Sequence, residues 1–499
     1  MATSPLAFVV AVTLLLSGHS SVFAANVARD QLRQEAEEFE KKGEWERAAE
    51  VYWRIFSQDQ KAPGIGQKLL LCLRHVQQAR RHQDRIYREQ VRALPFSKSL
   101  KGYAEALQKL QANYVDRDKT AITSLFQQGL DEFIFALHEP VFRQQYLADV
   151  DPEPIHTFEL RLKEEWRSIS IKDLDEAQQA VREIALSAQK SLGLRPGVTV
   201  MEFVCGACNA LDERTAYLPP TEEQANAAGQ LTALGMSVVN NADGQLIIDH
   251  VVPSSWAAQA GLKEGSRIAL GRKASDKSDV DQVTEIMVTD REQKRTLPLP
   301  ADVPSVFDRQ LLAKGVGYLR LANFQKNTLN ELIEQIYLLQ GEGMKVLVLD
   351  LRGNPGGLFP VAVHVAERFL PGGVIVTTQG QAGPYNRTYE SQSGTSAFDF
   401  PLVVLVDADT ASAAELLAGA LKENQRAFLI GQRTFGKGTV QAVLQLSSTG
   451  GMRITLARFF SPRGESYNGL GVAPHIVETM RPRELALEHA LRILAMQPE

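Results

Sequence analysis

The stretch that decides the fold runs from 402 to 423 and reads LVVLVDADTASAAELLAGALKE. Its first five residues are apolar and predict a buried strand, and 412–423 has the apolar spacing of a helix. Ser412 therefore stands at or near a helix N-terminus, where free backbone N–H groups and the helix dipole stabilise an oxyanion. This position makes Ser412 a candidate nucleophile. Ser412 and Glu415 also match a capping box, in which the serine would only cap the helix.

Strands and helices alternate on both sides of this stretch. Apolar strands are predicted at 315–321, 345–350 and 427–430, and helices at 329–340 and 361–369. Such alternation predicts a largely parallel sheet covered by helices, with the active site at the strand ends. The chemistry is therefore expected between Asp350 and Gln441.

Lys437 follows Ser412 by twenty-five residues and lies between two glycines, after the predicted strand at 427–430. A neutral lysine can deprotonate a serine if its pKa falls from ~10.4 toward ~7–8, and burial is the main way to lower it. The two residues support a Ser–Lys dyad, with Ser412 as nucleophile and Lys437 as general base. The alternative is an ordinary solvated loop lysine.

Two other chemistries compete with the dyad. Residues 431–437 match most of a phosphate-binding loop, but Gly438 stands where a hydroxyl should hold magnesium, which argues against nucleotide hydrolysis. The chain has no G-x-S-x-G nucleophile elbow. A Ser–His–Asp arrangement that uses His250 or His364 stays open on spacing alone, without support from any motif.

Composition excludes several classes of function. Lys and Arg number 54 against 59 Asp and Glu, so the net charge of −5 gives no electrostatic footprint for nucleic acid. Cys205 and Cys208 form a C-x-x-C, but no second cysteine pair or spaced histidine pair completes a zinc site. We therefore expect no metal and no cofactor, and we interpret the cysteine pair as structural, with its oxidation state open.

The N-terminus predicts export. An apolar run at 6–16 precedes Val22-Phe23-Ala24, a small-x-small pattern typical of signal-peptide cleavage sites. Cleavage is expected after Ala24, with a short uncleaved anchor as the alternative. The chain is then expected in the periplasm or another extracytoplasmic space, without membrane contact after cleavage. No other stretch is apolar enough over its length to span a bilayer.

Residues 27–100 predict helical hairpins, with one unit at 43–53 that resembles half of a tetratricopeptide repeat. A single unit cannot bury its apolar face alone, so packing within the chain is favoured. Binding of an adaptor, or self-association, through these helices is the other interpretation. Helical periodicity continues over 101–225, and short strands separated by Gly and Pro follow.

Several motifs in one order resemble the C-terminal processing peptidases, or tail-specific proteases. These are serine peptidases with a PDZ domain beside a core related to the crotonase and Clp protease folds. The resemblance covers roughly 103–478. It rests on LDERTAYL at 211–218, DLRGNPGG at 350–357, the Ser412 and Lys437 blocks, and FFSPRG at 459–464.

The resemblance implies roles for single residues. Ser412 would attack the scissile carbonyl, Lys437 would accept its proton, and Gln441 would hydrogen-bond Lys437 and orient it. The backbone N–H groups of Ala413 and of either Gly356 or Gly357 would form the oxyanion hole. The chain departs from the family at 213–214, where Glu-Arg replaces the usual Pro-His.

The PDZ-like segment departs most from the family. Leu234, Gly235 and Met236 would supply the loop that holds a peptide carboxylate, beside an edge strand. The polar residues at 272–280 (RKASDKSDV) leave little room for the helix that normally forms the other wall of the groove. We therefore predict weak peptide binding and a mainly structural or gating role.

The sequence thus predicts a multidomain α+β protein. The expected parts are a signal peptide at 1–24, a helical tetratricopeptide-like region at 27–100, a helical N-terminal peptidase region at 101–225, a PDZ-like domain at 226–303, an α/β ClpP/crotonase-like Ser–Lys core at 304–480 and a C-terminal helix at 481–499. The predicted function is a serine endopeptidase that cleaves exported proteins or peptides at or near accessible C-termini. The alternative is a catalytically silent PDZ and helical-repeat scaffold.

Overall fold

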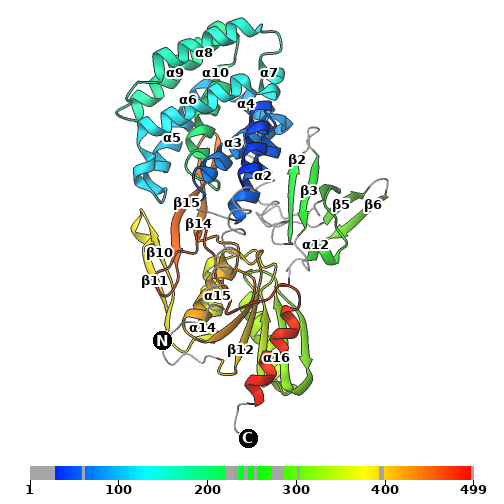
Figure 1. The fold of residues 1–499 in the computed structure, drawn as a ribbon. Coiled ribbons are helices and arrows are strands. Elements are labelled where there is room, and N and C mark those ends of the chain that lie inside the picture. The colour runs from blue at the N-terminus through cyan, green and yellow to red at the C-terminus, as the bar shows by residue number, and fades with distance from the viewer. Residues whose placement is uncertain are drawn as a thin grey trace, which may run out of the picture.

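The structure is a computed structural model that describes residues 29–58, 62–219, 231, 234–240, 245–251, 256–271, 285–290, 293–299, 304–392 and 398–495. Figure 1 shows a group of helices at one end, a sheet covered by helices at the other, and a small sheet at the side. The predicted signal peptide at 1–24 and the polar segment at 272–280 lie outside the described residues.

A six-stranded sheet has the order β16-β13-β12-β9-β8-β7. Its neighbours pair in parallel except β7, which is antiparallel to β8, so the sheet is largely parallel as the alternating pattern predicts. The strands are β7 (Val306–Leu312), β8 (Val316–Leu321), β9 (Val346–Asp350), β12 (Leu402–Val406), β13 (Ala427–Gly431) and β16 (Ile476–Val477).

Alternate residues of this sheet enter two apolar cores. Leu347 and Leu349 of β9 pack with α13 (Thr328–Gly341), α14 (Phe359–Phe369) and α15 (Ala413–Glu423). Val346 and Val348 face the opposite core, which includes Ala486 of α16 (Pro482–Ala495). Helices therefore cover both faces, which explains why β9 and β12 are buried along their whole length.

A second sheet connects this part to the helices. Its order is β1-β15-β10-β11, with β14 paired to β15. Met452 and Ile454 of β15 belong to the same apolar core as the helical region, so the long strand joins the two parts (Figure 1). The strands are β1 (Ala216–Leu218), β10 (Gly373–Gly380), β11 (Arg387–Ser391), β14 (Thr439–Leu446) and β15 (Gly450–Phe460).

The helical region begins with a helix at 29–42 and a hairpin of α2 (Trp45–Gln58) and α3 (Ile65–Gln83). Its centre is α10, which is buried along nearly its whole length. The helices after the hairpin are α4 (Arg85–Ala93), α5 (Phe96–Asn113), α6 (Ile122–His138), α7 (Pro140–Tyr146), α8 (Pro152–Trp166), α9 (Leu174–Leu192) and α10 (Pro196–Asn209). Short 3-10 turns occur at Arg117–Thr120, Ala313–Gly315 and Gly383–Tyr385.

The C-x-x-C pair lies within α10. Cys205 and Cys208 are buried free thiols in the structure, with no disulfide between them. Burial raises the pKa of Cys205 to about 12, which keeps the thiol protonated and unreactive. The pair therefore contributes to packing.

The small sheet is an antiparallel meander in the order β2-β3-β4-β5-β6. Leu234 and Met236 are buried in its core, and Gly235 between them has a positive φ of 82°. In the described sheet, β2 forms one edge, the position that strand addition by a peptide requires. The elements are β2 (Met236–Asn240), β3 (Leu246–Val251), α12 (Trp256–Gln259), β4 (Arg267–Gly271), β5 (Glu285–Asp290) and β6 (Gln293–Pro298).

Candidate active site

Ser412 lies in the sharp turn between β12 and α15, directly before the first residue of the helix. Its φ of 57° and ψ of −117° are unusual for a residue with a side chain. Strained strand-to-helix turns of this kind expose the nucleophile of hydrolases. Here the turn forms without the flanking G-x-S-x-G sequence. Strain of this kind gathers at functional sites, which favours the nucleophile interpretation.

The glycine turn at 353–357 packs directly against the serine turn. A Cβ atom added to Gly356 would lie 2.8 Å from Ser412 Cβ and 2.9 Å from the Ala413 nitrogen, so only glycine fits. The Gly356 N–H donates to Asn354 Oδ1 at 2.8 Å. Within the described residues, the N–H groups of Ala413 and Gly357 have no hydrogen-bond acceptor. The N–H groups of Ala413 and Gly357 are therefore better candidates for an oxyanion hole than the N–H of Gly356, which already has an acceptor.

Glu415 links the serine turn to the lysine loop, residues 432–438. Its fully buried carboxylate accepts the Ser412 N–H at 2.8 Å and the Lys437 N–H at 2.7 Å on the same oxygen, Oε2. Oε1 accepts the Gly436 N–H at 2.7 Å and the Thr434 hydroxyl at 2.5 Å. Burial raises the pKa of Glu415, while these hydrogen bonds act in the opposite direction.

The sequence assigned Glu415 only to a capping box. A capping box predicts the hydrogen bond from the Ser412 N–H to Glu415. It does not predict the hydrogen bonds from the lysine loop to the same carboxylate. Gly436 lies 21 residues away along the chain, so no local pattern signals the contact. In the sequence, the position of Glu415 three residues after Ser412 indicates only its contact with the serine turn.

Lys437 is largely buried in the lysine loop, and its pKa is lowered to about 8. Burial is the main cause, and the positive charges of Arg214 and Arg453 act in the same direction, whereas Glu415 opposes them. Arg453 Nε donates to the Arg214 carbonyl at 2.7 Å, so the two side chains belong to one cluster. Arg214 stands where the resembled family usually has a histidine, and no sequence pattern around it indicates a role near Lys437.

Gln441 lies on β14, four residues after Lys437. Its Nε2 donates to Thr439 Oγ1 at 2.7 Å and to Thr455 Oγ1 at 3.5 Å. Among the described contacts there is no hydrogen bond between Gln441 and Lys437. The expected orientation of the lysine by Gln441 therefore stays a prediction.

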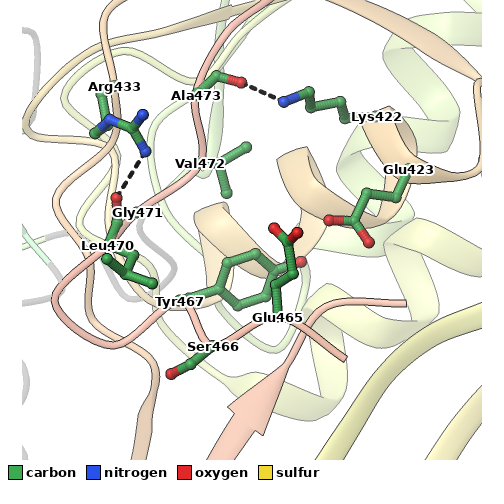
Figure 2. A pocket seen from close by; sticks show the side chains of 10 residues that line it. All are labelled: Lys422, Glu423, Arg433, Glu465, Ser466, Tyr467, Leu470, Gly471, Val472 and Ala473. Carbon is green, nitrogen blue, oxygen red and sulfur yellow. Dashed lines mark hydrogen bonds between the residues drawn. The ribbon is translucent and has the colours of Figure 1, made fainter. Parts of the chain in front are cut away.

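The turn at 467–473 is hydrogen-bonded to the lysine loop through the backbone of Thr434 and Gly436. Arg433 Nη1 donates to the Leu470 carbonyl at 3.0 Å and Lys422 Nζ to the Ala473 carbonyl at 2.7 Å (Figure 2). Between them is a cavity of about 240 Å³, which is lined in part by Glu465 and Tyr467. Neither Ser412 nor Lys437 lines this cavity, so it lies outside the candidate dyad.

The competing chemistries gain no support from the fold. The loop after β13 leads into strand β14, whereas a phosphate-binding loop leads into a helix. His364 is exposed on α14, and the side chain of His250 lies outside the described residues. The described part of the chain contains no cluster of three His, Cys, Asp or Glu side chains that could hold a metal ion. Among the described helices, none combines the length and apolarity of a membrane span.

Comparisons with known proteins found a family model, relatives and a solved structure that are similar to this chain. The sequence model of Peptidase family S41 matches residues 315–478. A carboxyl-terminal-processing protease of Synechocystis sp. is 33% identical over 320 residues, which cover 57% of this chain and 74% of the relative. A carboxy-terminal-processing protease of Bartonella bacilliformis is 31% identical over 296 residues, 54% of this chain and 68% of the relative. The solved structure of a photosystem II D1 C-terminal processing protease is 24% identical, with a TM-score of 0.46 over 80% of this chain and 98% of that one.

Proposed function

The chain belongs to the carboxyl-terminal-processing proteases of peptidase family S41, and from this premise we propose that it cleaves exported proteins at or near their C-termini with a Ser412–Lys437 dyad. Membership in the family makes the chain a peptidase. The dyad, the export of its substrates and the division of the chain into the predicted domains belong to the proposal.

In the proposed reaction, neutral Lys437 takes the hydroxyl proton of Ser412 as Oγ attacks the scissile carbonyl. The Ala413 and Gly357 N–H groups stabilise the negative oxygen of the tetrahedral intermediate. The intermediate collapses as Lys437 gives its proton to the leaving amine, and the acyl-enzyme forms. Water then attacks the acyl carbonyl, with Lys437 again as base, and its proton returns to Ser412 Oγ as the acid product leaves.

The observation that carries this proposal is the shared carboxylate of Glu415. One oxygen accepts both the Ser412 and the Lys437 N–H, so the backbones of the two loops are tied together at one point. The pKa of Lys437, lowered to about 8, supplies the second requirement, a lysine that is partly neutral near physiological pH.

The substrate class rests on the relatives and on the predicted export. Relatives are named for carboxyl-terminal processing, and the same preference is proposed here. We propose that the chain acts in the periplasm or a comparable compartment on proteins with accessible C-termini. The PDZ-like domain would have a structural or gating role, and the N-terminal helices would be the place for an adaptor or a second copy.

Labelling with a fluorophosphonate, which reacts covalently with activated serines, tests the proposal directly. Wild-type protein is expected to be labelled and to cleave an unfolded protein substrate. Ser412→Ala should abolish both, and Lys437→Met should reduce both by several orders of magnitude while circular dichroism shows an intact fold. Near-wild-type cleavage by Ser412→Ala would refute the dyad, and an unlabelled, inactive wild type would favour the scaffold.

A further inference from the structure

An aromatic contact joins the N-terminal hairpin to the lysine loop. The rings of Trp53, on α2, and Phe435, two residues before Lys437, have centroids 6.3 Å apart and planes inclined by 31°. Figure 1 shows α2 at the lower edge of the helical region, toward α15. Trp53 lies outside residues 315–478, so the family match does not include this contact. We call Trp53 and Phe435 the aromatic pair.

The hairpin holds Trp53 in a fixed position. Ala48, Tyr52 and Ile55 of α2 are buried against α3, which leaves Trp53 on the outer face of the helix. The other end of α3 is anchored by buried ion pairs, in which Arg81 contacts both Glu132 and Glu202. Trp53 therefore projects toward the lysine loop from a well-anchored support.

Phe435 is held equally firmly by its backbone. Its N–H donates to the Thr410 carbonyl at 3.0 Å, and the next N–H, that of Gly436, donates to Glu415. The backbone of Phe435 is therefore fixed two residues before Lys437, and its ring contacts Trp53.

The aromatic pair leaves much of its own surface uncovered. Trp53 is 48% exposed and Phe435 is 40% exposed, although their rings are in contact. A contact that served only to attach the hairpin would bury both rings, because burial of apolar area supplies its stability. Two large exposed rings at a candidate active site instead match the surfaces that receive apolar groups.

We propose that the aromatic pair binds the apolar side chain that follows the scissile bond of the substrate. The inference rests on the proposed function, because it uses the position of the general base. Lys437 must reach the leaving amine within hydrogen-bond distance, so the first residue of the departing segment passes over the lysine loop. An aromatic or long aliphatic side chain at that position would lie across Phe435 and Trp53. Trp53 is thus a specificity-determining residue contributed by a part of the chain outside the family match.

The test uses full-length protein and quenched fluorescent peptides that differ only in the residue after the scissile bond, Phe, Leu or Gly. Trp53→Ala should lower kcat/KM for the Phe and Leu peptides about tenfold and leave the Gly peptide nearly unchanged. Trp53→Phe should retain most of the preference, since it keeps an aromatic ring. The matched control is Tyr337→Ala, which removes another half-exposed ring, one that contacts Phe398 instead of the lysine loop.

Fluorophosphonate labelling separates this proposal from the one on which it rests, because the reagent carries no residue on the leaving side. Normal labelling of Trp53→Ala with a lost preference supports the binding surface. Normal labelling with an unchanged preference overturns it, as does an equal loss on all three peptides. Absence of labelling and cleavage in the wild type would overturn the proposed function, and this inference with it.

Discussion

Two buried glutamates in this protein differ in the kind of partner that their carboxylates contact. Glu202 of α10 and Glu415 of α15 are both fully inaccessible to solvent. Glu202 contacts nitrogen atoms of two side chains, Arg81 Nη2 at 2.8 Å and His82 Nε2 at 3.1 Å. Glu415 instead accepts hydrogen bonds from three backbone N–H groups and one hydroxyl.

The partners decide the consequences of burial. Arg81 and His82 overcome desolvation and lower the pKa of Glu202 to about 2, so this carboxylate stays charged and fastens α10 to α3. At Glu415 burial prevails and the pKa is raised. Backbone donors have fixed directions, so Glu415 specifies the geometry of two loops. An ion pair thus joins two helices, whereas a carboxylate with backbone donors positions the two loops of the candidate site.

The largest expected effect is on stability, from the ion-pair centre. Glu202→Ala removes one of the two carboxylates that contact Arg81 and the carboxylate beside His82, and should cost about 3–5 kcal/mol of unfolding free energy. Urea denaturation followed by circular dichroism measures this loss. Glu183→Gln, an exposed change on α9, should be close to neutral. A similar small effect for both variants would contradict the role assigned to Glu202.

The same centre predicts a pH dependence. The pKa of Glu202 is lowered from 4.5 to about 2 on folding, so its stabilisation is fully present above pH 4.5 and is lost as the pH falls toward 2. Glu202→Gln should therefore flatten the acid side of the stability curve between these values. Denaturation midpoints of both proteins measured from pH 2 to pH 7 test this expectation. An unchanged loss of stability at acid pH in Glu202→Gln would show that Glu202 is not the cause of the pH dependence.

The second effect concerns catalysis and should leave the fold largely intact. Glu415→Gln replaces an acceptor oxygen by an NH₂ group that faces backbone donors, which displaces the serine turn or the lysine loop. Misplacement of about 1 Å lowers rates roughly 100-fold, and we expect a loss of that order in kcat/KM. Glu423→Gln, in the same helix but bonded to the Arg463 N–H, is the matched control and should retain activity. Equal activity of the two variants would exclude Glu415 as the link.

The pH profile of activity should follow the lysine. Because Lys437 must be neutral to accept a proton in the proposed dyad and its pKa is lowered to about 8, kcat/KM should rise with pH, with a midpoint near pH 8 and a plateau about one to two pH units higher. A histidine base would give a midpoint near ~6.5 instead. Initial rates in buffers of constant ionic strength measure the midpoint, and a value near that of histidine would favour His364 or His250.

The smallest effect belongs to Arg214. Arg214→Gln removes one positive charge near Lys437, so the protonated lysine becomes easier to form and the midpoint should move upward by less than about one pH unit. The shift should shrink at high salt, because ions screen the interaction. Arg161→Gln, which is bonded to serines of α9, should leave the midpoint in place. A downward shift in Arg214→Gln would contradict the assignment.

The sequence by itself determined the main elements of the core and the candidate reactive residues. Strand β12, the serine before α15 and the lysine between glycines all follow from patterns within a few residues, as does the largely parallel sheet. Such patterns are informative because hydrophobic periodicity and helix ends depend on near neighbours. The motifs that resemble the family are also short segments, and they can be recognised without knowledge of the tertiary structure.

Tertiary structure alone decided which distant residues meet. The bonds of Glu415 to the lysine loop, the charge of Arg214 near Lys437 and the contact of Trp53 with Phe435 join segments far apart in sequence. The same packing left the Gly357 N–H without an acceptor among the residues that the structure describes. No period or spacing specifies these contacts, because they depend on how whole helices and sheets pack against one another and on the burial that results.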